Sequence, residues 1–477
     1  MSRFILVVIL LCLSPIHCQV ILSHSNLPII SINTKDQNIS DDSRIIAKMG
    51  VIDNENINYT SDDFNNYNGR ISIEHRGTSS LLFPKKSYSI ETQDSIGDNN
   101  NVSLLGMPIE NDWILYAPYG DRSFIRNALT YYLYDKMGYY SPKYRFCELL
   151  LNNEYMGIYL LIEKIKRDKN RIDIEEMNIN DVEFEDISGG YIIQIDRSSD
   201  NKNKYWTSSF NSSSGDSIYF QYIYPKWDNI NDYQKSYVQE LIYNFEASII
   251  YNNNLYLYNL YDNLINVESF IDYFIISELS KNIDAYRFST YLYKNHDDID
   301  KRIHIGPVWD FNWAYGNSTF CEADITEGWE FNTSCGKYNP IWYSILTKDS
   351  VFNDLLKCRW NHLRREIVSI DNINSFIDSL SNNYKEGFER DFLRWKRKKN
   401  TDHHQQIINL KEWINKRIEW LDNNILGTCQ NENQIIDEPA NLIMITDILG
   451  RKTEEKPNIV LFYIYDNGTI ERKIIVK

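Results

Sequence analysis

The sequence predicts an α+β protein with two lobes, a β-rich N-terminal lobe and a helical C-terminal lobe, followed by a small all-β appendage. Short runs that alternate apolar and polar residues, typical of strands, fill the chain up to about residue 225. From there apolar residues recur at helical spacing, as in 231–251, 267–281 and 404–425. Residues 441–477 return to strand patterns and are too few for more than a small β unit.

These changes of pattern give five segments. They are a leader at 1–18, a β-rich lobe at 19–225, a helical lobe at 226–429, a polar linker at 430–440 and the β unit at 441–477. The two lobes together, residues 19–429, form the main body.

Composition excludes some classes of partner. With 477 residues, 43% of them hydrophobic, the chain can bury large cores. Its net charge of -16 argues against nucleic acid or an anionic membrane surface as the main partner, because both attract basic patches. No stretch beyond the leader is apolar over enough residues for a transmembrane helix in the mature chain.

The N-terminus predicts export. Arg3, the apolar run 4–13 and Pro15 form the pattern of a signal peptide. Cys18 leaves open lipoprotein processing, but Ile16-His17 lacks the small residues expected before such a cysteine, which favours simple cleavage after residue 18. The protein is therefore expected to be secreted or held at the outer cell surface.

Five cysteines follow the leader, and an oxidising compartment would let four of them pair. Cys321 with Cys335 can close one loop, and Cys358 with Cys429 can tie the last helices together. Cys147, within an apolar strand pattern, is then the one left unpaired. No spacing of Cys and His indicates zinc, and His403-His404 is expected to face solvent.

The stretch KRIHIGPVWDFNWAYGN, residues 301–317, carries the strongest chemical signal. A strand pattern breaks at Gly306-Pro307 and is followed by Asp310 and Asn312, set between aromatic residues. Hard oxygen ligands of this kind suit Mg²⁺ or Mn²⁺, which bind one or two carboxylates plus substrate phosphates. A strand end with a capping Asp is the simpler alternative.

The preceding segment strengthens the metal interpretation. Residues 288–294 and 301–305 read as two strands joined by a turn, which predicts a hairpin. A hairpin brings its outer ends together, so Asp284 should lie near Asp310. Protein kinases arrange a catalytic-base Asp and a metal-binding Asp in this way. The chain has neither HRD nor DFG, so a kinase of this kind would be atypical.

Three further segments suggest groups that bind ATP. Lys86 follows Lys85 at the start of a strand and shares a face with Tyr88, so an inward Tyr88 would bring Lys86 to a concave sheet face that grips phosphate. Glu163 ends an apolar strand, where a carboxylate needs a partner, and an ion pair with Lys86 is the natural proposal. Solvated lysines and a solvated Glu163 are the alternatives.

Arg126 lies in the first turns of a helix that is expected to end at Gly138. The helix dipole favours anions at that end, so an arginine there needs a partner of its own. A carboxylate or a phosphate would serve, and Arg126 is therefore a further candidate for ATP binding.

Together these segments resemble the CotH family of atypical secretory kinases. The resemblance covers roughly residues 65–320 and rests on Arg76-Gly77, Ser80, 83–88, Asp121, Arg126-Asn127, 157–159, Glu163, 189–191, Asp196, Asp284 and 306–311. It implies a divergent protein-kinase-like two-lobed fold and transfer of the ATP γ-phosphate to protein serines. It also implies Asp284 as catalytic base, Asp310 as metal ligand and a lysine of Lys85-Lys86 on phosphate. Asn312 departs from the family, which usually has a second Asp there.

The tail resembles a type IX secretion sorting domain of Bacteroidetes, with 447–451 as the recognisable turn and 462–466 after it. That resemblance implies a Gram-negative source and a partner in the secretion machinery of the outer membrane.

The preferred hypothesis is therefore a secreted or cell-surface atypical Ser/Thr protein kinase that uses ATP and Mg²⁺ or Mn²⁺ and acts on a protein substrate. The alternative is a catalytically silent CotH-like surface adhesin or scaffold, with which Asn312 is compatible. A glycoside-cleaving carboxylate pair, Asp284 with Asp310, is disfavoured because it needs neither a lysine-bearing sheet nor a metal ligand.

Overall fold

The structure is a computed structural model that describes residues 20–251, 258–395, 402–429, 442–447, 451–456, 460–465 and 470–474. The predicted signal peptide, the linker 430–440, residues 448–450 of the predicted tail turn and Asp466 lie outside the described residues. Within them, strands and helices are mixed, so the α+β prediction is confirmed. None of the described helices is both long and apolar enough to cross a membrane.

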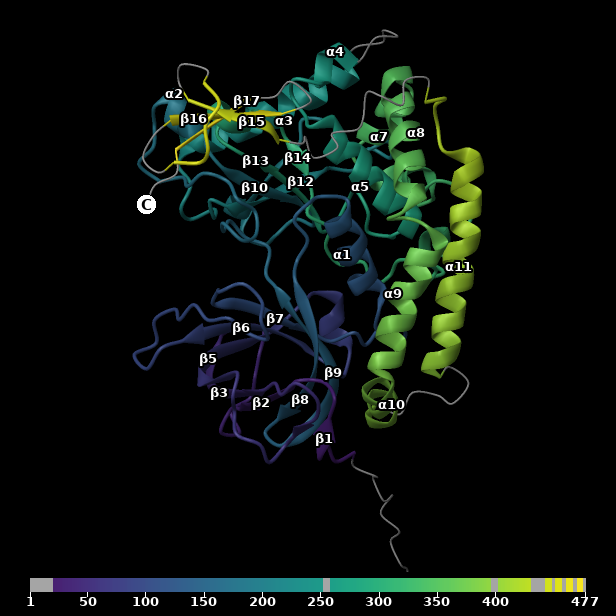
Figure 1. The fold of residues 1–477 in the computed structure, drawn as a ribbon. Coiled ribbons are helices and arrows are strands. Elements are labelled where there is room, and N and C mark those ends of the chain that lie inside the picture. The colour runs from purple at the N-terminus through teal and green to yellow at the C-terminus, as the bar shows by residue number, and fades with distance from the viewer. Residues whose placement is uncertain are drawn as a thin grey trace, which may run out of the picture.

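The N-terminal strands close into a barrel (Figure 1). Around the barrel the order is β2 (Ile29–Asn33), β3 (Ile45–Ile52), β5 (Tyr67–Arg76), β6 (Ser87–Gln93), β7 (Asp112–Tyr116), β9 (Glu154–Glu163) and β8 (Tyr144–Leu151). The parallel pair of β2 and β8 closes the ring, and the other pairs are antiparallel. Two further strands, β1 (His24–Ser25) and β4 (Asn58–Tyr59), pair with each other.

Alternation along each strand separates the barrel interior from its outer face. In β6 the side chains of Tyr88 and Ile90 are buried in the barrel core. In β9, Tyr159 and Leu161 share that core, whereas Ile162 packs in the other large core, between the barrel and the helices. Which face a residue occupies decides whether it can reach the rest of the molecule.

A second, five-stranded antiparallel sheet lies above the barrel in Figure 1. Its order is β11 (Tyr205–Thr207), β12 (Tyr219–Tyr224), β10 (Tyr191–Ile195), β13 (Thr290–Lys294) and β14 (His304–Ile305). The hairpin predicted from residues 288–305 is β13 with β14, and it is confirmed. The lobe boundary predicted at residue 226 is wrong, because β10 pairs with β13 across it. The N-terminal β structure is thus a closed barrel ending at β9 plus a separate sheet completed by later strands.

Helices pack against this sheet and along one side of the barrel (Figure 1). They are α1 (Arg126–Lys136), α2 (Phe184–Ile187), α3 (Asp232–Ile250), α4 (Tyr258–Tyr261), α5 (Val267–Ser280), α6 (Asp297–Asp300), α7 (Trp342–Leu346), α8 (Ser350–Arg365), α9 (Ile370–Asn383), α10 (Lys385–Arg394) and α11 (His403–Asn424). Side-chain caps fix several starts, such as Asn231 before α3 and Asp402 before α11. The central helix is α5, whose side chains are almost all buried.

The barrel is joined to α10 by a buried ion pair. Lys85 pairs with Asp391 of α10, and both side chains are fully buried. Lys85 Nζ also donates to Ile158 O at 2.5 Å, while Asp391 accepts from Ile158 N at 3.0 Å. Gly157 allows this approach, since a Cβ there would lie 2.2 Å from Asp391 Oδ2 and its φ is +93°. The pair therefore fixes α10 against β9.

His403 is also buried, contrary to the expectation that it faces solvent. Its ring packs at a tilt against Phe388 of α10, and its Nε2 lies 3.2 Å from Ser123 O. Burial lowers the pKa of His403 to about 4, so the ring is neutral at physiological pH. It packs the start of α11 against α10.

Both disulfides allowed by the sequence are present, Cys321–Cys335 and Cys358–Cys429. Cys147 is unpaired and buried in the barrel core, as expected. Cys358 lies on α8 and Cys429 follows α11, so this disulfide ties the two helices together.

Removing the Cys358–Cys429 disulfide is expected to lower the free energy of unfolding by ~4 kcal/mol. It closes 71 residues, and longer closed loops restrict the unfolded chain more. The paired change Cys358→Ser with Cys429→Ser, measured by denaturant unfolding, tests this. Removing Cys321–Cys335, with a separation of 14, should cost about 1 kcal/mol less. Equal or absent losses would contradict the chain-entropy argument.

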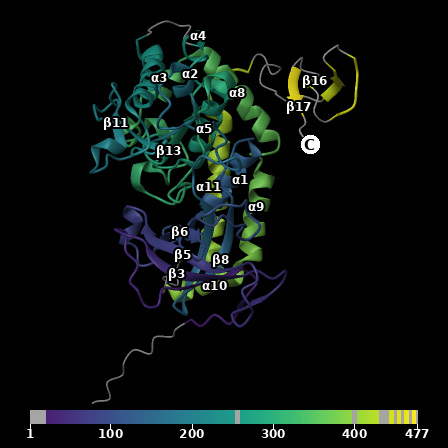
Figure 2. The ribbon, with the colours of Figure 1, turned by 90° about the vertical axis from the view of Figure 1, so that its left-hand side faces the viewer.

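The tail forms the small all-β unit that the sequence predicts. Strands β15 (Leu442–Thr446), β16 (Val460–Tyr465) and β17 (Ile470–Ile474) make an antiparallel sheet, set apart from the body in Figure 2. Asp447 N donates to Arg451 O at 2.9 Å.

Candidate active site

A cavity of about 380 Å³ lies where the barrel, α1 and the second sheet meet. Its charged lining residues are Arg76, Asp196, Arg197, Asp284 and Asp310. The rest of the wall comes from the loop 77–80, from α1 through Asn127 and Tyr131, and from aromatic residues that include Phe83, Tyr116, Phe288, Trp309 and Trp313.

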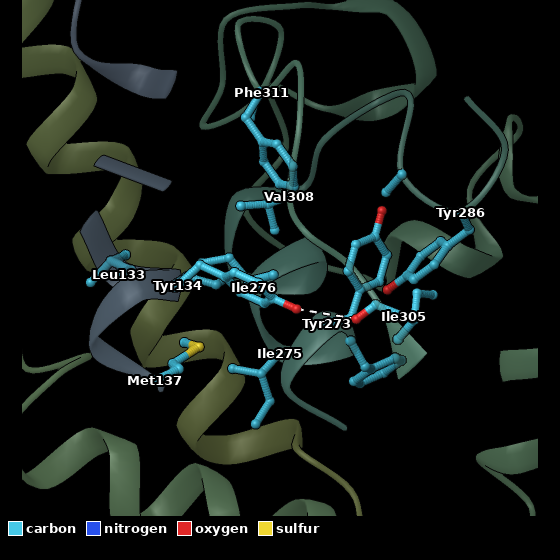
Figure 3. Close-up of a cluster of buried hydrophobic side chains, with 14 of the residues drawn as sticks. Leu133, Tyr134, Met137, Tyr273, Ile275, Ile276, Tyr286, Ile305, Val308 and Phe311 are labelled. Carbon is cyan, nitrogen blue, oxygen red and sulfur yellow. Dashed lines mark hydrogen bonds between the residues drawn. The ribbon is translucent and has the colours of Figure 1, made fainter. Parts of the chain in front are cut away.

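Asp284 is placed by the end of α5. The helix stops at Lys281, whose backbone is left-handed with φ of +47°, and the chain turns toward the cavity. The turn is closed by Phe288 N, which donates to Asp284 O at 3.0 Å. Tyr286 anchors this loop in the core, where it is buried next to Tyr273 of α5 (Figure 3). Asp284 is therefore held on a short loop fixed to the core.

Asp310 is placed by its buried neighbours. Val308 and Phe311 are in the core cluster shown in Figure 3, on either side of the aspartate in sequence. Phe311 N donates to Asn127 Oδ1 of α1 at 2.7 Å, which ties the loop to that helix. Asp310 itself has φ of +63°, a conformation rare outside glycine that clusters at functional sites. The fold thus holds this carboxylate in a strained, fixed position.

The carboxylates act on one another. Burial, with the charges of Asp284 and Asp196, raises the pKa of Asp310 to about 7, against the opposing charges of Arg76 and Arg197. Burial also raises the pKa of Asp284 and of Asp196. The proximity of Asp284 and Asp310 that the hairpin predicted is therefore present, since both line one cavity and repel each other.

Without divalent cations, ionised Asp310 is expected to destabilise the fold as pH rises. Its folded pKa, about 7, exceeds the ordinary value of 3.8, so the folded state holds an extra proton between these values and loses that stabilisation as pH rises through 7. Asp310→Asn removes the effect. Its free energy of unfolding, minus that of the wild type, should increase between pH 5 and pH 8 in chelator. A difference independent of pH would contradict the raised pKa.

Asp310 and Asn312 offer oxygen atoms at one point. With its amide nitrogen turned toward Asp310, Asn312 Nδ2 donates to Asp310 Oδ1 at 2.6 Å and its oxygen accepts from Trp313 Nε1 at 3.2 Å. Rotating the amide would present its oxygen instead. Within the described ranges no group of three or more His, Cys, Asp and Glu side chains can hold a metal ion by itself. The two residues fit an ion such as Mg²⁺ that completes its shell with water and substrate phosphates.

Lys85 and Lys86 do not line the cavity. Lys85 is committed to Asp391, as described above. Lys86 Nζ donates to the Leu81 carbonyl, which closes the 3₁₀ turn Ser79–Leu82. The concave face expected for Lys86 is in fact the barrel interior, since Tyr88 and Ile90 of the same face fill the barrel core.

The predicted ion pair between Lys86 and Glu163 is wrong. Glu163 accepts from Lys143 N at 3.0 Å and from Tyr140 Oη at 3.2 Å, and it lies 3.9 Å from Arg171 Nε. In β9, Glu163 shares the barrel-interior face with Tyr159 and Leu161, while its neighbour Ile162 lines the cavity. Closure of the sheet into a barrel therefore turns both Lys86 and Glu163 away from the site.

Arg126 has the carboxylate partner that was one of its two predicted options. Its Nη1 lies 2.6 Å from Asp121 Oδ1, and its Nε donates to Ala314 O at 2.9 Å. The side chain is buried and is not among the cavity-lining residues. Arg126 thus tethers the chain that follows Asp310, in place of the expected contact with ATP.

Sequence reasoning did not select Asp196, Arg197 and Arg76 as site residues. Asp196 and Arg197 follow β10, and Arg76 ends β5 just before Gly77. The signal was available, since Asp196 follows a buried strand as Asp310 does. What was not available was the pairing of β10 with β13, which brings the two strand ends together.

The family model described as CotH kinase protein matches residues 73–421, well over half of the 477 residues. The matched range begins in β5 and ends in α11, so it includes every residue that lines the cavity. No curated protein matches the chain.

Proposed function

The chain belongs to the CotH kinase family, and from this premise we propose that it is an atypical Ser/Thr protein kinase that transfers the ATP γ-phosphate to protein hydroxyls. One observation supports the proposal most. Asp284 and Asp310 come from two different loops, yet both are fixed to the core and line one cavity. A phosphotransferase needs a base for the acceptor and an anionic ligand for a divalent ion at one place.

In this proposal each aspartate has a separate task. Asp284 orients the acceptor hydroxyl and takes its proton, a task that its raised pKa favours. Asp310, assisted by Asn312, holds the divalent ion. When bound, Mg²⁺ or Mn²⁺ would offset the charge that develops on the transferred phosphoryl group. The fixed loops supply positioning, which accounts for most catalysis in phosphoryl transfer.

The cavity walls suit a nucleotide. Trp313 and Phe83 line the cavity with aromatic rings, and ATP carries a planar base that can stack on such rings. A volume of about 380 Å³ lies within the range of small-molecule and cofactor sites.

We extend the proposal to location and partners. The leader 1–18 would direct export, and the tail would engage a type IX secretion machinery, leaving the kinase secreted or on the outer surface. The two disulfides support an oxidising compartment. The acceptor is a protein with Ser or Thr residues.

The test is transfer from γ-labelled ATP by the chain lacking only residues 1–18, with Mg²⁺ or Mn²⁺. Label is expected in phosphoserine or phosphothreonine, in the chain itself or in added proteins, and should be absent with Asp284→Asn. Asp298→Asn, an equal charge change on an exposed side chain of α6, is the matched control and should behave as wild type. Transfer that survives Asp284→Asn would contradict the assignment of the base.

A catalytically silent scaffold is the second candidate. It is favoured by Asn312, which contributes no charge where the family usually has an aspartate, and by the lack of a complete ligand cluster among the described residues. This candidate predicts that neither ATP nor Mn²⁺ changes the melting temperature and that no label is transferred.

A further inference from the structure

Two arginines line the cavity without a carboxylate partner. In the part of the chain that the structure describes, no Asp or Glu oxygen lies within 4.0 Å of the guanidinium of Arg76 or Arg197. Arg76 is half-buried and Arg197 is exposed. Other arginines do have carboxylate partners, as half-buried Arg359 has Asp272 and fully buried Arg417 has Glu278. An arginine on a cavity wall that has no internal anion is available for an anionic ligand.

Aromatic rings hold these two guanidinium groups in place. Arg76 lies over the ring of Trp309 at 5.7 Å from its centroid, and Arg197 lies over Phe288 at 4.2 Å. Such contacts orient a guanidinium without using its N–H donors. The positive charges of Arg76 and Arg197 oppose the rise in the pKa of Asp310, which indicates that both guanidinium groups lie near that carboxylate.

Barrel closure explains why Arg76 reaches the cavity and Lys86 does not. In β5, Ile71 and Ile73 point into the barrel core. Arg76 comes three residues after Ile73, and because side chains alternate along a strand it lies on the outer face. Its partner across the strands is Ser87, which also lines the cavity. Lys86 precedes Ser87 and falls on the opposite face.

The loop after Arg76 adds hydroxyl groups. Thr78, Ser79 and Ser80 all line the cavity. Gly77 is required for this path, since its φ is +118° and a Cβ there would lie 1.9 Å from Ser80 Oγ. Hydroxyl donors next to a guanidinium are typical partners of phosphate oxygens.

The charges of the lining residues fit a polyanion only when a cation is bound. Three aspartates face two arginines, which leaves one excess negative charge when all are ionised. One divalent ion at Asp310 would convert this into one excess positive charge. The cavity should therefore bind metal and polyphosphate together better than it binds polyphosphate alone.

We infer that Arg76, with Arg197 facing the same cavity, binds the phosphate groups of the donor nucleotide, in the role expected for a lysine of the Lys85-Lys86 pair. This inference rests on the proposed function, because it concerns the same cavity. A planar guanidinium can hold two phosphate oxygens at once, whereas an ammonium acts as a point charge.

The experiment measures binding of inorganic triphosphate with Mg²⁺ to the full chain by calorimetry, without any transfer step. Arg76→Gln should weaken binding at least tenfold and Arg76→Lys less, while Arg197→Gln should weaken it severalfold. Arg145→Gln removes an exposed arginine outside this cavity and should leave binding unchanged. Unfolding curves confirm that each variant is folded.

Three outcomes would overturn the inference: no binding of triphosphate by the wild type, equal binding by Arg76→Gln, or a larger loss with Lys86→Gln than with Arg76→Gln. Failure of the kinase proposal looks different. Binding of triphosphate that depends on Arg76, with no transfer of label under any condition, would support the phosphate site and remove the kinase. Undiminished transfer of label by Arg76→Gln would support the kinase and remove Arg76 as the phosphate-binding residue.

Discussion

Asp310→Asn is expected to lower phosphate transfer by on the order of 10²–10³-fold or more, because it removes the only charged ligand assigned to the divalent ion. The amide keeps the shape and the oxygen of the side chain but not the charge. Mn²⁺ affinity should fall together with activity, while the overall fold is kept. Initial rates with labelled ATP and a Mn²⁺ titration measure both effects.

Stability separates loss of function from loss of structure in this variant. Asp310 is a carboxylate whose ionised form is disfavoured by burial and by two neighbouring aspartates. At pH 8 without divalent ions, Asp310→Asn should therefore be at least as stable as the wild type. Asp298→Asn should alter neither activity nor Mn²⁺ affinity. An inactive variant that is also strongly destabilised would leave Asp310 as a structural residue and contradict its role as ligand.

The site was predictable from sequence where it depends on local pattern. The alternation in 288–294 and 301–305, with a turn between, is enough to specify a hairpin, and a hairpin brings Asp284 toward Asp310. The strand break at Gly306-Pro307 marks the start of the second loop. These features involve residues close in the chain, so their pattern alone carries the information.

The phosphate contacts were mispredicted because they depend on closure of the barrel. The ring closes through a parallel pairing of β2 with β8, which are far apart in sequence and whose patterns do not specify each other. An open sheet would have one concave face, and Lys86 was assigned to it together with Tyr88. In a closed barrel that face is the interior, so the outer-face residue Arg76 is the one that lines the cavity.

The predicted lobe boundary at residue 226 is wrong for a similar reason, since it too depends on pairing between strands far apart in the sequence. Residues 191–224 have the strand patterns of the N-terminal part and were assigned to its lobe, but β10 pairs with β13 from the later part. That pairing is also what places Asp196 in the cavity.

Lys85→Met is expected to cost about 3–5 kcal/mol of unfolding free energy, since it leaves Asp391 charged, buried and without its cation. A phosphate-binding lysine would behave differently, with activity lost and stability kept. Denaturant unfolding therefore decides between the structural role and the role expected from the family resemblance. Lys385→Met on the exposed side of α10 is the matched control, and its change should stay within about 0.5 kcal/mol.

The double variant Lys85→Met with Asp391→Leu provides the sharper measurement. Each single change leaves one buried charge, but the double change leaves none, so the destabilisation of the pair should be well below the sum of the two single values. The coupling should be several kcal/mol because both side chains are fully buried. Additive losses would mean that the two residues act independently. Strong coupling with nucleotide binding retained in the double variant would show that Lys85 holds α10 against the barrel and leaves phosphate to other residues.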